Sequence, residues 1–96
     1  MKPPPGFDWD PEHAAEVLRR TGYSFLDAVH VFQDEEFDYL RIGPEERNGE
    51  SRYRAVGRLP WGSVVVVAYT MRHGLRRLVW VRTANRKEEK AFYDAQ

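Results

Sequence analysis

The chain has 96 residues, no cysteine and a formal net charge of zero, with 42% hydrophobic and 31% charged residues. This length accommodates one small domain, and the balance is typical of a globular protein rather than a disordered one. The composition excludes disulfides, thiolate zinc sites and cysteine nucleophiles. No apolar run approaches the ~20 residues of a membrane helix, and the start lacks a signal-peptide core, so we expect a cytoplasmic protein without a membrane partner.

The charges are distributed unevenly although they sum to zero. From Asp34 to Glu50 there are seven acidic and two basic residues, whereas from Ser51 to Lys90 there are ten basic and two acidic residues. A basic half in a neutral chain predicts a surface that binds a polyanion. The alternative is that the arginines cover solvated strand faces.

The first elements follow a proline-rich leader, residues 1–5, which we expect to be disordered. Residues 6–96 are expected to form the single domain and to open with a strand at residues 6–9. A helix is expected from Pro11 to about Arg20, because Asp10 is a good N-cap and a proline suits the first helical position.

The middle of the chain continues with a second helix, from Phe25 to about Phe32, capped by Ser24. An edge strand is predicted at residues 37–42, followed by a loop marked by Gly43-Pro44 and Asn48-Gly49. Residues 52–58 alternate between basic and apolar and predict another strand.

A β-hairpin within residues 62–84 is the element around which the rest of the predicted fold is organised. Val64 to Val67 are typical of a buried strand, His73-Gly74 indicates a turn, and Leu75 to Ala84 return as the second strand. Alternation predicts that one face of the return strand carries Arg76, Leu78, Trp80 and Arg82. A last helix is expected from Arg86 to about Asp94, with Asn85 as its cap. The order predicts an α+β domain, with helices on one face of a mostly antiparallel sheet.

Four segments carry a resemblance to a known family: Phe7 to Glu12, Arg20 to Phe32, the strands from Arg52 to Arg58 and from Val66 to Arg72, and Leu78 to Glu88. In this order and spacing they resemble the BrnT family, the ribonuclease toxins of type II toxin–antitoxin systems. The resemblance implies a RelE-like fold: a short N-terminal strand, two helices, a mostly antiparallel four-stranded sheet and a C-terminal helix. It also implies an RNA substrate and a partner antitoxin with a ribbon-helix-helix domain, through which alone the protein would contact DNA.

The sequence departs from the family pattern at three places. His13 stands where the family usually has lysine, Arg20-Thr21-Gly22 stands where it has Lys-His-Gly, and Trp80 stands where a small residue is expected. Each place is a plausible part of an active site.

Metal-independent RNA cleavage proceeds by attack of the ribose 2′-OH on the neighbouring phosphate and requires cations for the phosphorane charge. An arginine fork pairs two phosphate oxygens at once. We therefore expect Arg82 to be the principal phosphate ligand, supported by Arg72 and Arg52. The alternative is that these arginines pair with the acidic stretch.

The acid and base are expected from Glu88 and His13. Glu88 is in the first turn of the last helix, where a surface charge is the more frequent role. Histidine is the side chain whose ordinary pKa lies in the useful range, although an exposed histidine such as His13 is more often only solvated. His13 and Glu16 are too few for a metal site, and we expect neither a metal nor a cofactor.

Further RNA contacts are expected from residues around these arginines. Tyr69 and Trp80 are candidates for stacking on unpaired bases, although strand aromatics are more often core residues. Arg20, Asn85 and Lys87 complete the expected RNA-binding set.

Two functions of different classes remain open. The first is a metal-independent endoribonuclease toxin held inactive by an antitoxin. The second is a catalytically silent relative that binds a protein partner or regulates transcription with it. The lost junction histidine and Trp80 favour this relative, whereas the retained Arg52, Arg72, Arg82 and Glu88 favour the enzyme. A structural subunit with the acidic stretch as its docking strip has no motif in its support.

Overall fold

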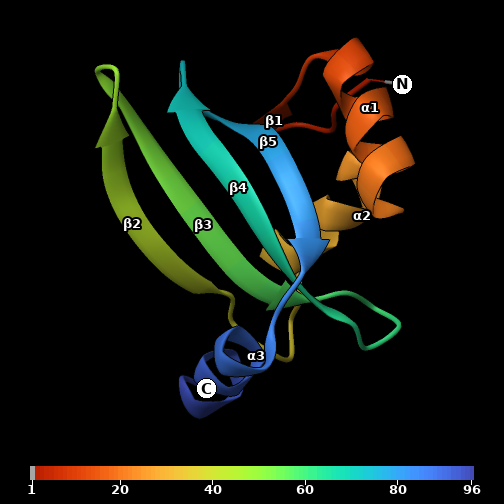
Figure 1. Ribbon diagram of the computed structural model, residues 1–96, viewed down its shortest axis with the longest axis vertical. Helices are drawn as coiled ribbons and strands as arrows, with labels where there is room; N and C mark the ends of the chain where they lie inside the picture. The colour runs from red at the N-terminus through yellow and green to blue at the C-terminus, as the bar shows by residue number, and fades with distance from the viewer. Residues whose placement is uncertain (1) are drawn as a thin grey trace.

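The elements of the computed structural model, which describes residues 2–96, follow the predicted order (Figure 1). In chain order they are β1 (Phe7–Asp8), α1 (Pro11–Thr21), α2 (Phe25–Val29), the 3₁₀ turn η1 (His30–Phe32), β2 (Leu40–Arg47), β3 (Glu50–Arg58), β4 (Val64–Arg72), β5 (Leu75–Thr83) and α3 (Arg86–Asp94). No helix in the described part of the chain is long and apolar enough to cross a membrane.

The helices begin where side chains satisfy their first backbone N–H groups. The Asp10 carboxylate accepts a hydrogen bond from the Glu12 N–H at 3.1 Å, and the Ser24 hydroxyl accepts one from the Asp27 N–H at 3.0 Å. Both predicted N-caps are confirmed, because capping depends on residues only two or three positions apart. The second helix is α-helical only to Val29, and the last turn tightens into the 3₁₀ form.

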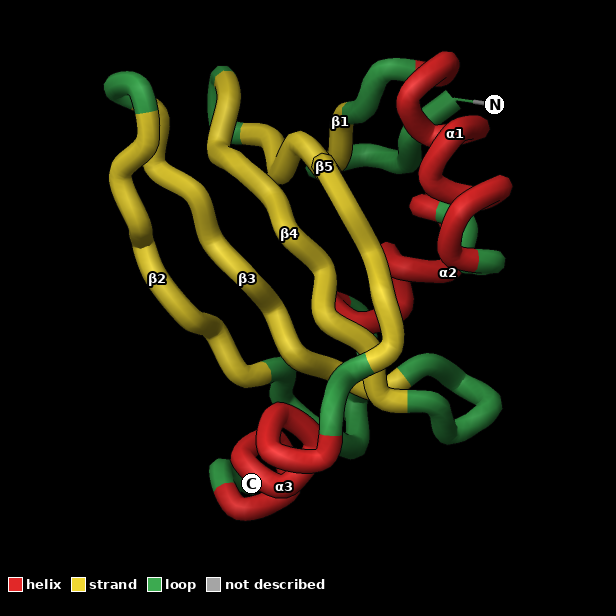
Figure 2. The backbone as a smooth tube through the Cα atoms, in the orientation of Figure 1, coloured by secondary structure: helices red, strands yellow, loops and turns green. Residues whose placement is uncertain are grey.

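The five strands form one sheet in the order β1-β5-β4-β3-β2 (Figure 2). β1 pairs with β5 in parallel, and the other neighbours are antiparallel. The α+β class and the predicted hairpin at His73-Gly74 are confirmed, and β1 extends the four strands that follow the helices into a five-stranded sheet. In the expected leader, the Pro4 carbonyl accepts a hydrogen bond from the Phe7 N–H at 3.1 Å, which closes the turn before β1. Met1 lies outside the described residues.

β2 differs from its prediction. It begins at Leu40 and continues to Arg47 through Gly43-Pro44, where a loop was expected, and only Asn48-Gly49 forms the turn. Its pairing with β3 shifts between Ile42 and Glu45. Gly43 has φ +111°, and a Cβ there would lie 2.8 Å from the Arg52 carbonyl oxygen. Glycine and proline therefore mark an irregularity in an edge strand, where both are tolerated, rather than the end of the strand.

β5 contains a bulge that changes the predicted faces. Ala68 pairs with Trp80, but the next residue, Tyr69, pairs with Leu78, so one extra residue interrupts the alternation. Arg76 therefore faces the helical layer, opposite to Arg82. Its guanidinium lies 4.6 Å from the Phe32 ring centroid. The prediction that Arg76 and Leu78 share the face of Arg82 is wrong, because a bulge reverses the side on which the following residues point.

Two apolar cores lie on opposite faces of the sheet. On one face α1, α2 and η1 pack on the sheet around a large cluster that includes Val17, Phe25 and Val67. On the other face Phe92 of α3 packs into a smaller cluster with Val66 and its neighbours. α3 lies across the end of the strands in Figure 1. The prediction that all helices share one face is thus wrong for α3.

Candidate active site

The sheet face that carries α3 is otherwise uncovered by helices and is rich in arginine. Cross-strand partners point to the same side of a sheet, so the register places several arginines on it, among them Arg52 and Arg54 of β3, Arg72 of β4 and Arg82 of β5. We call these four residues and the surface between them the open face. The three arginines expected to act together, Arg52, Arg72 and Arg82, thus lie on one face of three neighbouring strands.

Arg82 is clamped by a carboxylate of α3. Its Nη1 and Nη2 groups each donate to one oxygen of Glu88, both at 2.8 Å, and Nη1 also donates to the Thr83 carbonyl at 3.2 Å. Glu88 is itself fixed by a capping box: its carboxylate accepts from the Asn85 N–H, and the Asn85 side chain accepts from the Glu88 N–H. We call Arg82, Glu88 and Asn85 the arginine clamp.

The clamp leaves one edge of the guanidinium for a ligand. An arginine has five N–H donors in a plane, and three of those of Arg82 are used by Glu88 and Thr83. The Nε–H and the second Nη2–H lie on one edge and have no acceptor among residues 2–96. The Arg82 side chain is 40% exposed, whereas that of Glu88 is 14% exposed. The free edge thus has the geometry that pairs two oxygens of a phosphate.

The clamp also determines the charge of both partners. The pKa of Glu88 is lowered from 4.5 to about 2, chiefly by hydrogen bonding from Arg82 and against the opposing effect of burial. The Asn85 N–H and the charges of Arg82 and Arg54 contribute to the same lowering. The hydrogen bond between Arg82 and Glu88 also raises the pKa of Arg82. A carboxylate with so low a pKa is a poor proton acceptor at neutral pH, so the geometry favours Glu88 as the group that orients Arg82.

We expect Glu88 to make the stability of the chain pH-dependent. Because its pKa is lower in the folded state, its contribution to the free energy of unfolding is complete above about pH 4.5 and is lost as the pH falls towards 2. The expected loss is about 1–2 kcal/mol, since solvent at Arg82 screens the pair. Urea unfolding of the wild type and Glu88→Gln across this range measures it. The free energy of unfolding of Glu88→Gln should depend less steeply on pH than that of the wild type. Equal slopes for the two proteins would contradict the prediction.

The other expected phosphate ligands do not meet Arg82 at one point. Arg82 pairs with Val66, whereas Arg72 lies six residues further along β4, about 20 Å away. The Arg72 Nη2 lies 3.4 Å from the Glu50 Oε2. Arg72 therefore pairs with the acidic stretch, which was the alternative to its role as a phosphate ligand. Arg52 pairs with Thr70, four residues beyond Val66, about 13 Å along the strand. The arginines therefore form a track along the sheet and do not surround a single phosphate.

Arg54 is the residue that the sequence interpretation missed. It pairs with Ala68, only two residues beyond Val66, so it is nearer to the arginine clamp than Arg52 is. Its charge acts on Glu88, and it has no ion-pair partner in the described part of the chain. The signal was present in the sequence, because Arg54 is two residues from Arg52 and alternation puts both on one face.

His13 and Arg20 belong to the helical layer. The His13 Nε2–H donates to the Val79 carbonyl at 2.6 Å. β1 pairs with β5 only at Arg76 and Arg77, so Val79 lies on a free edge of the sheet where its carbonyl needs a partner. Arg20 pairs with Glu16 on α1 at 3.2 Å. Neither side chain contacts the arginine clamp.

The remaining expected RNA contacts separate into two groups. Tyr69 is 3% exposed and stacks on Tyr53 with ring centroids 5.3 Å apart, so its ring is a core group. Trp80 is partly buried against the helix-side core, 6.4 Å from the His13 ring. Asn85 and Lys87, in contrast, lie at the start of α3 within or beside the clamp, and Lys87 is exposed.

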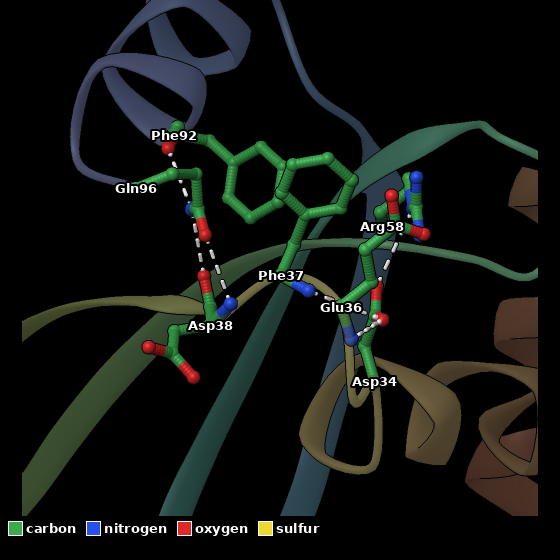
Figure 3. Close-up of polar contacts among 7 residues, drawn as sticks. All are labelled: Asp34, Glu36, Phe37, Asp38, Arg58, Phe92 and Gln96. Carbon is green, nitrogen blue, oxygen red and sulfur yellow. Dashed lines mark hydrogen bonds and ion pairs between the residues drawn. The ribbon is translucent and has the colours of Figure 1, made fainter.

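α3 is attached at its far end as well (Figure 3). The Gln96 amide donates to the Asp38 carbonyl and accepts from the Asp38 N–H, both at 2.9 Å. Arg58 lies 4.1 Å from the Phe37 ring centroid and pairs with Asp34 and Glu36. The acidic segment thus folds beneath α3 and helps to hold the helix that carries Glu88. Among residues 2–96 no group of three or more histidines and carboxylates is placed to hold a metal ion.

Comparisons with known proteins agree with this architecture. The family model described as the ribonuclease toxin BrnT of type II toxin–antitoxin systems matches residues 9–88. The 1.1 Å crystal structure of the Brucella abortus ribonuclease toxin BrnT has a similar fold, with a TM-score of 0.65 and 16% identity over 83% of this chain and 96% of that chain. No curated protein matches the chain. The resemblance found in the sequence is confirmed, and the chain belongs to the BrnT family of ribonuclease toxins of type II toxin–antitoxin systems.

Proposed function

We propose that this chain is a metal-independent endoribonuclease toxin in which Arg82 stabilises the charge that develops on the phosphate. The observation that supports this most directly is the free Nε/Nη2 edge of a guanidinium whose other edge is held by Glu88. Preorganised donors directed at developing charge commonly make the greatest single contribution to catalysis. The clamp aligns Arg82 before the substrate arrives.

In the proposed reaction the ribose 2′-oxygen attacks the adjacent phosphorus while the bond from phosphorus to the 5′-oxygen breaks. The products are a 2′,3′-cyclic phosphate and a 5′-hydroxyl; the 2′-OH loses its proton and the 5′-oxygen gains one. Arg82 pairs with the non-bridging oxygens, and Arg54 adds positive charge nearby. Arg52 and Arg72 bind neighbouring phosphates along the track, with Asn85 and Lys87 beside the clamp.

The contacts of Glu88 and His13 favour roles other than acid and base. Glu88 has a pKa of about 2, and the Nε2–H of His13 is used by Val79. We therefore assign Glu88 to the orientation of Arg82, His13 to the attachment of α1 to β5, and the proton transfers to water. This assignment predicts a rate that rises with hydroxide concentration near neutral pH.

Incubation of the purified chain with a mixed-sequence RNA in EDTA tests the proposal. We expect internal cleavage with cyclic phosphate and 5′-hydroxyl ends, identified by end-labelling and mass spectrometry. Products with 5′-phosphates, or cleavage that EDTA abolishes, would contradict the mechanism.

The proposed partner is an antitoxin with a ribbon-helix-helix domain that covers the open face in the cytoplasm and alone contacts DNA. Family membership supports an antitoxin partner, and the cationic track supports an acidic contact surface on it.

A silent binding module is the second candidate. It is favoured by the distance of Arg72 and Arg52 from Arg82 and by the low pKa of Glu88. RNA binding that weakens with salt, without cleavage, would support it over the enzyme.

A further inference from the structure

A hollow of about 180 Å³ opens on the open face between β2 and β3. Its lining includes Ile42, Glu45, Arg52, Arg54 and Ala68. It arises where the pairing of β2 with β3 shifts between Ile42 and Glu45. Gly43 carries no side chain into this gap, and Ala68 contributes only a methyl group, so the register shift leaves space that larger residues would fill.

The hollow combines an apolar surface with two kinds of polar group. Ile42 and Ala68 flank Arg54 in one row across the sheet, and Glu45 faces Arg52 in the next row. Neither Arg52 nor Arg54 has an ion-pair partner among residues 2–96. Glu45 approaches only Arg47, at 3.5 Å and with both side chains more than 60% exposed, a weak pair that a ligand can replace.

This combination matches an unpaired nucleobase. Planar guanidinium groups stack on bases and donate to their carbonyl oxygens, and apolar side chains cover their faces. Guanine carries two adjacent N–H donors, N1–H and the N2 amino group, which match the two oxygens of a carboxylate. It also carries adjacent O6 and N7 acceptors, which match an arginine fork. Adenine, cytosine and uracil lack the paired donors.

We propose that the hollow is a base subsite that receives an unpaired guanine, with Glu45 as the residue that selects it. The proposal rests on the proposed ribonuclease function for its biological role. Arg54 is two residues along the sheet and two strands across from Arg82, roughly 12 Å by the usual strand spacings. A base in the hollow and a phosphate on the clamp can therefore belong to the same short RNA segment.

Binding of the four nucleoside 5′-monophosphates to the full chain tests the subsite independently of cleavage. Amide shifts in two-dimensional NMR spectra report both the affinity and the place of binding. Glu45→Gln removes one of the two carboxylate acceptors. Glu46→Gln is the matched control, because it makes the same change at the next residue, which pairs with Ser51 on the other side of the strand.

We expect guanosine monophosphate to bind tightest and to shift residues 42–54. Glu45→Gln should weaken it by on the order of tenfold, and Glu46→Gln should not. RNA cleavage should then be enriched beside guanines in the wild type and less so in Glu45→Gln. Equal affinity for all four nucleotides, or retained guanine preference in Glu45→Gln, would overturn the subsite. Guanine-selective binding without any RNA cleavage would support the subsite and reject the nuclease.

Discussion

Arg82→Ala is expected to lower kcat/KM for RNA cleavage by about 10²–10³-fold, the usual cost of removing one preorganised donor group from a charged transition state. The substitution removes the free Nε/Nη2 edge and also leaves Glu88, which is 14% exposed, without its partner. Discontinuous assays with a fluorescent RNA measure the rate. Thermal unfolding of the same sample checks that the loss is not one of folding.

Two controls separate the role of Arg82 from the general effect of charge. Arg82→Lys keeps the charge but not the planar fork, so most of the loss should remain. Arg72→Ala removes the same charge about 20 Å along β4, and we expect less than a tenfold change, mainly in KM. Equal losses in Arg72→Ala and Arg82→Ala would mean that net charge, rather than the arginine clamp, drives the reaction.

Phe92→Ala is expected to lower the free energy of unfolding by about 3–5 kcal/mol, the range for deleting a buried aromatic ring. Phe92 is fully buried in the cluster that joins α3 to the sheet, with its ring centroid 6.0 Å from that of Phe37. For a domain of this size the loss is a large part of the total stability. Urea unfolding followed by circular dichroism provides the measurement.

Tyr93→Ala is the matched control for Phe92→Ala. Tyr93 is the next residue of α3 and also contacts Phe37, but it is 41% exposed. We expect Tyr93→Ala to lower the free energy of unfolding by about 1 kcal/mol, because little of the ring is removed from a packed core. If the two variants were equally stable, the packing of α3 on the sheet would contribute little, and the position of Glu88 would need another explanation.

Much of the local structure was predictable because it depends on neighbouring residues. The Asp10, Ser24 and Asn85 caps each bond a backbone N–H two or three residues away, so the sequence contains both partners. The turn at His73-Gly74 is similarly local, since these two residues accept positive φ.

The two strand irregularities were not predictable in this way. The extra residue in β5 near Val79 and the register shift at Gly43 are relations between two strands. A single strand does not reveal its register, and a shift of one residue exchanges the faces of all that follow. This is why Arg76 faces the helices while Arg82 faces the opposite side.

For the site, local sequence patterns were sufficient to predict the residue types and the α+β class, because alternation along a strand is a local property. That Arg52, Arg72 and Arg82 share one face depends on the register between three strands. Which of these residues act together depends on the folded arrangement of distant segments. The return of α3 across the open face brings Glu88 to Arg82, the strand lengths separate Arg72 from both, and the helical layer buries Tyr69. These outcomes depend on long-range packing of apolar side chains such as Phe92, whose partners lie 26 to 36 residues away in Val56, Val64 and Val66.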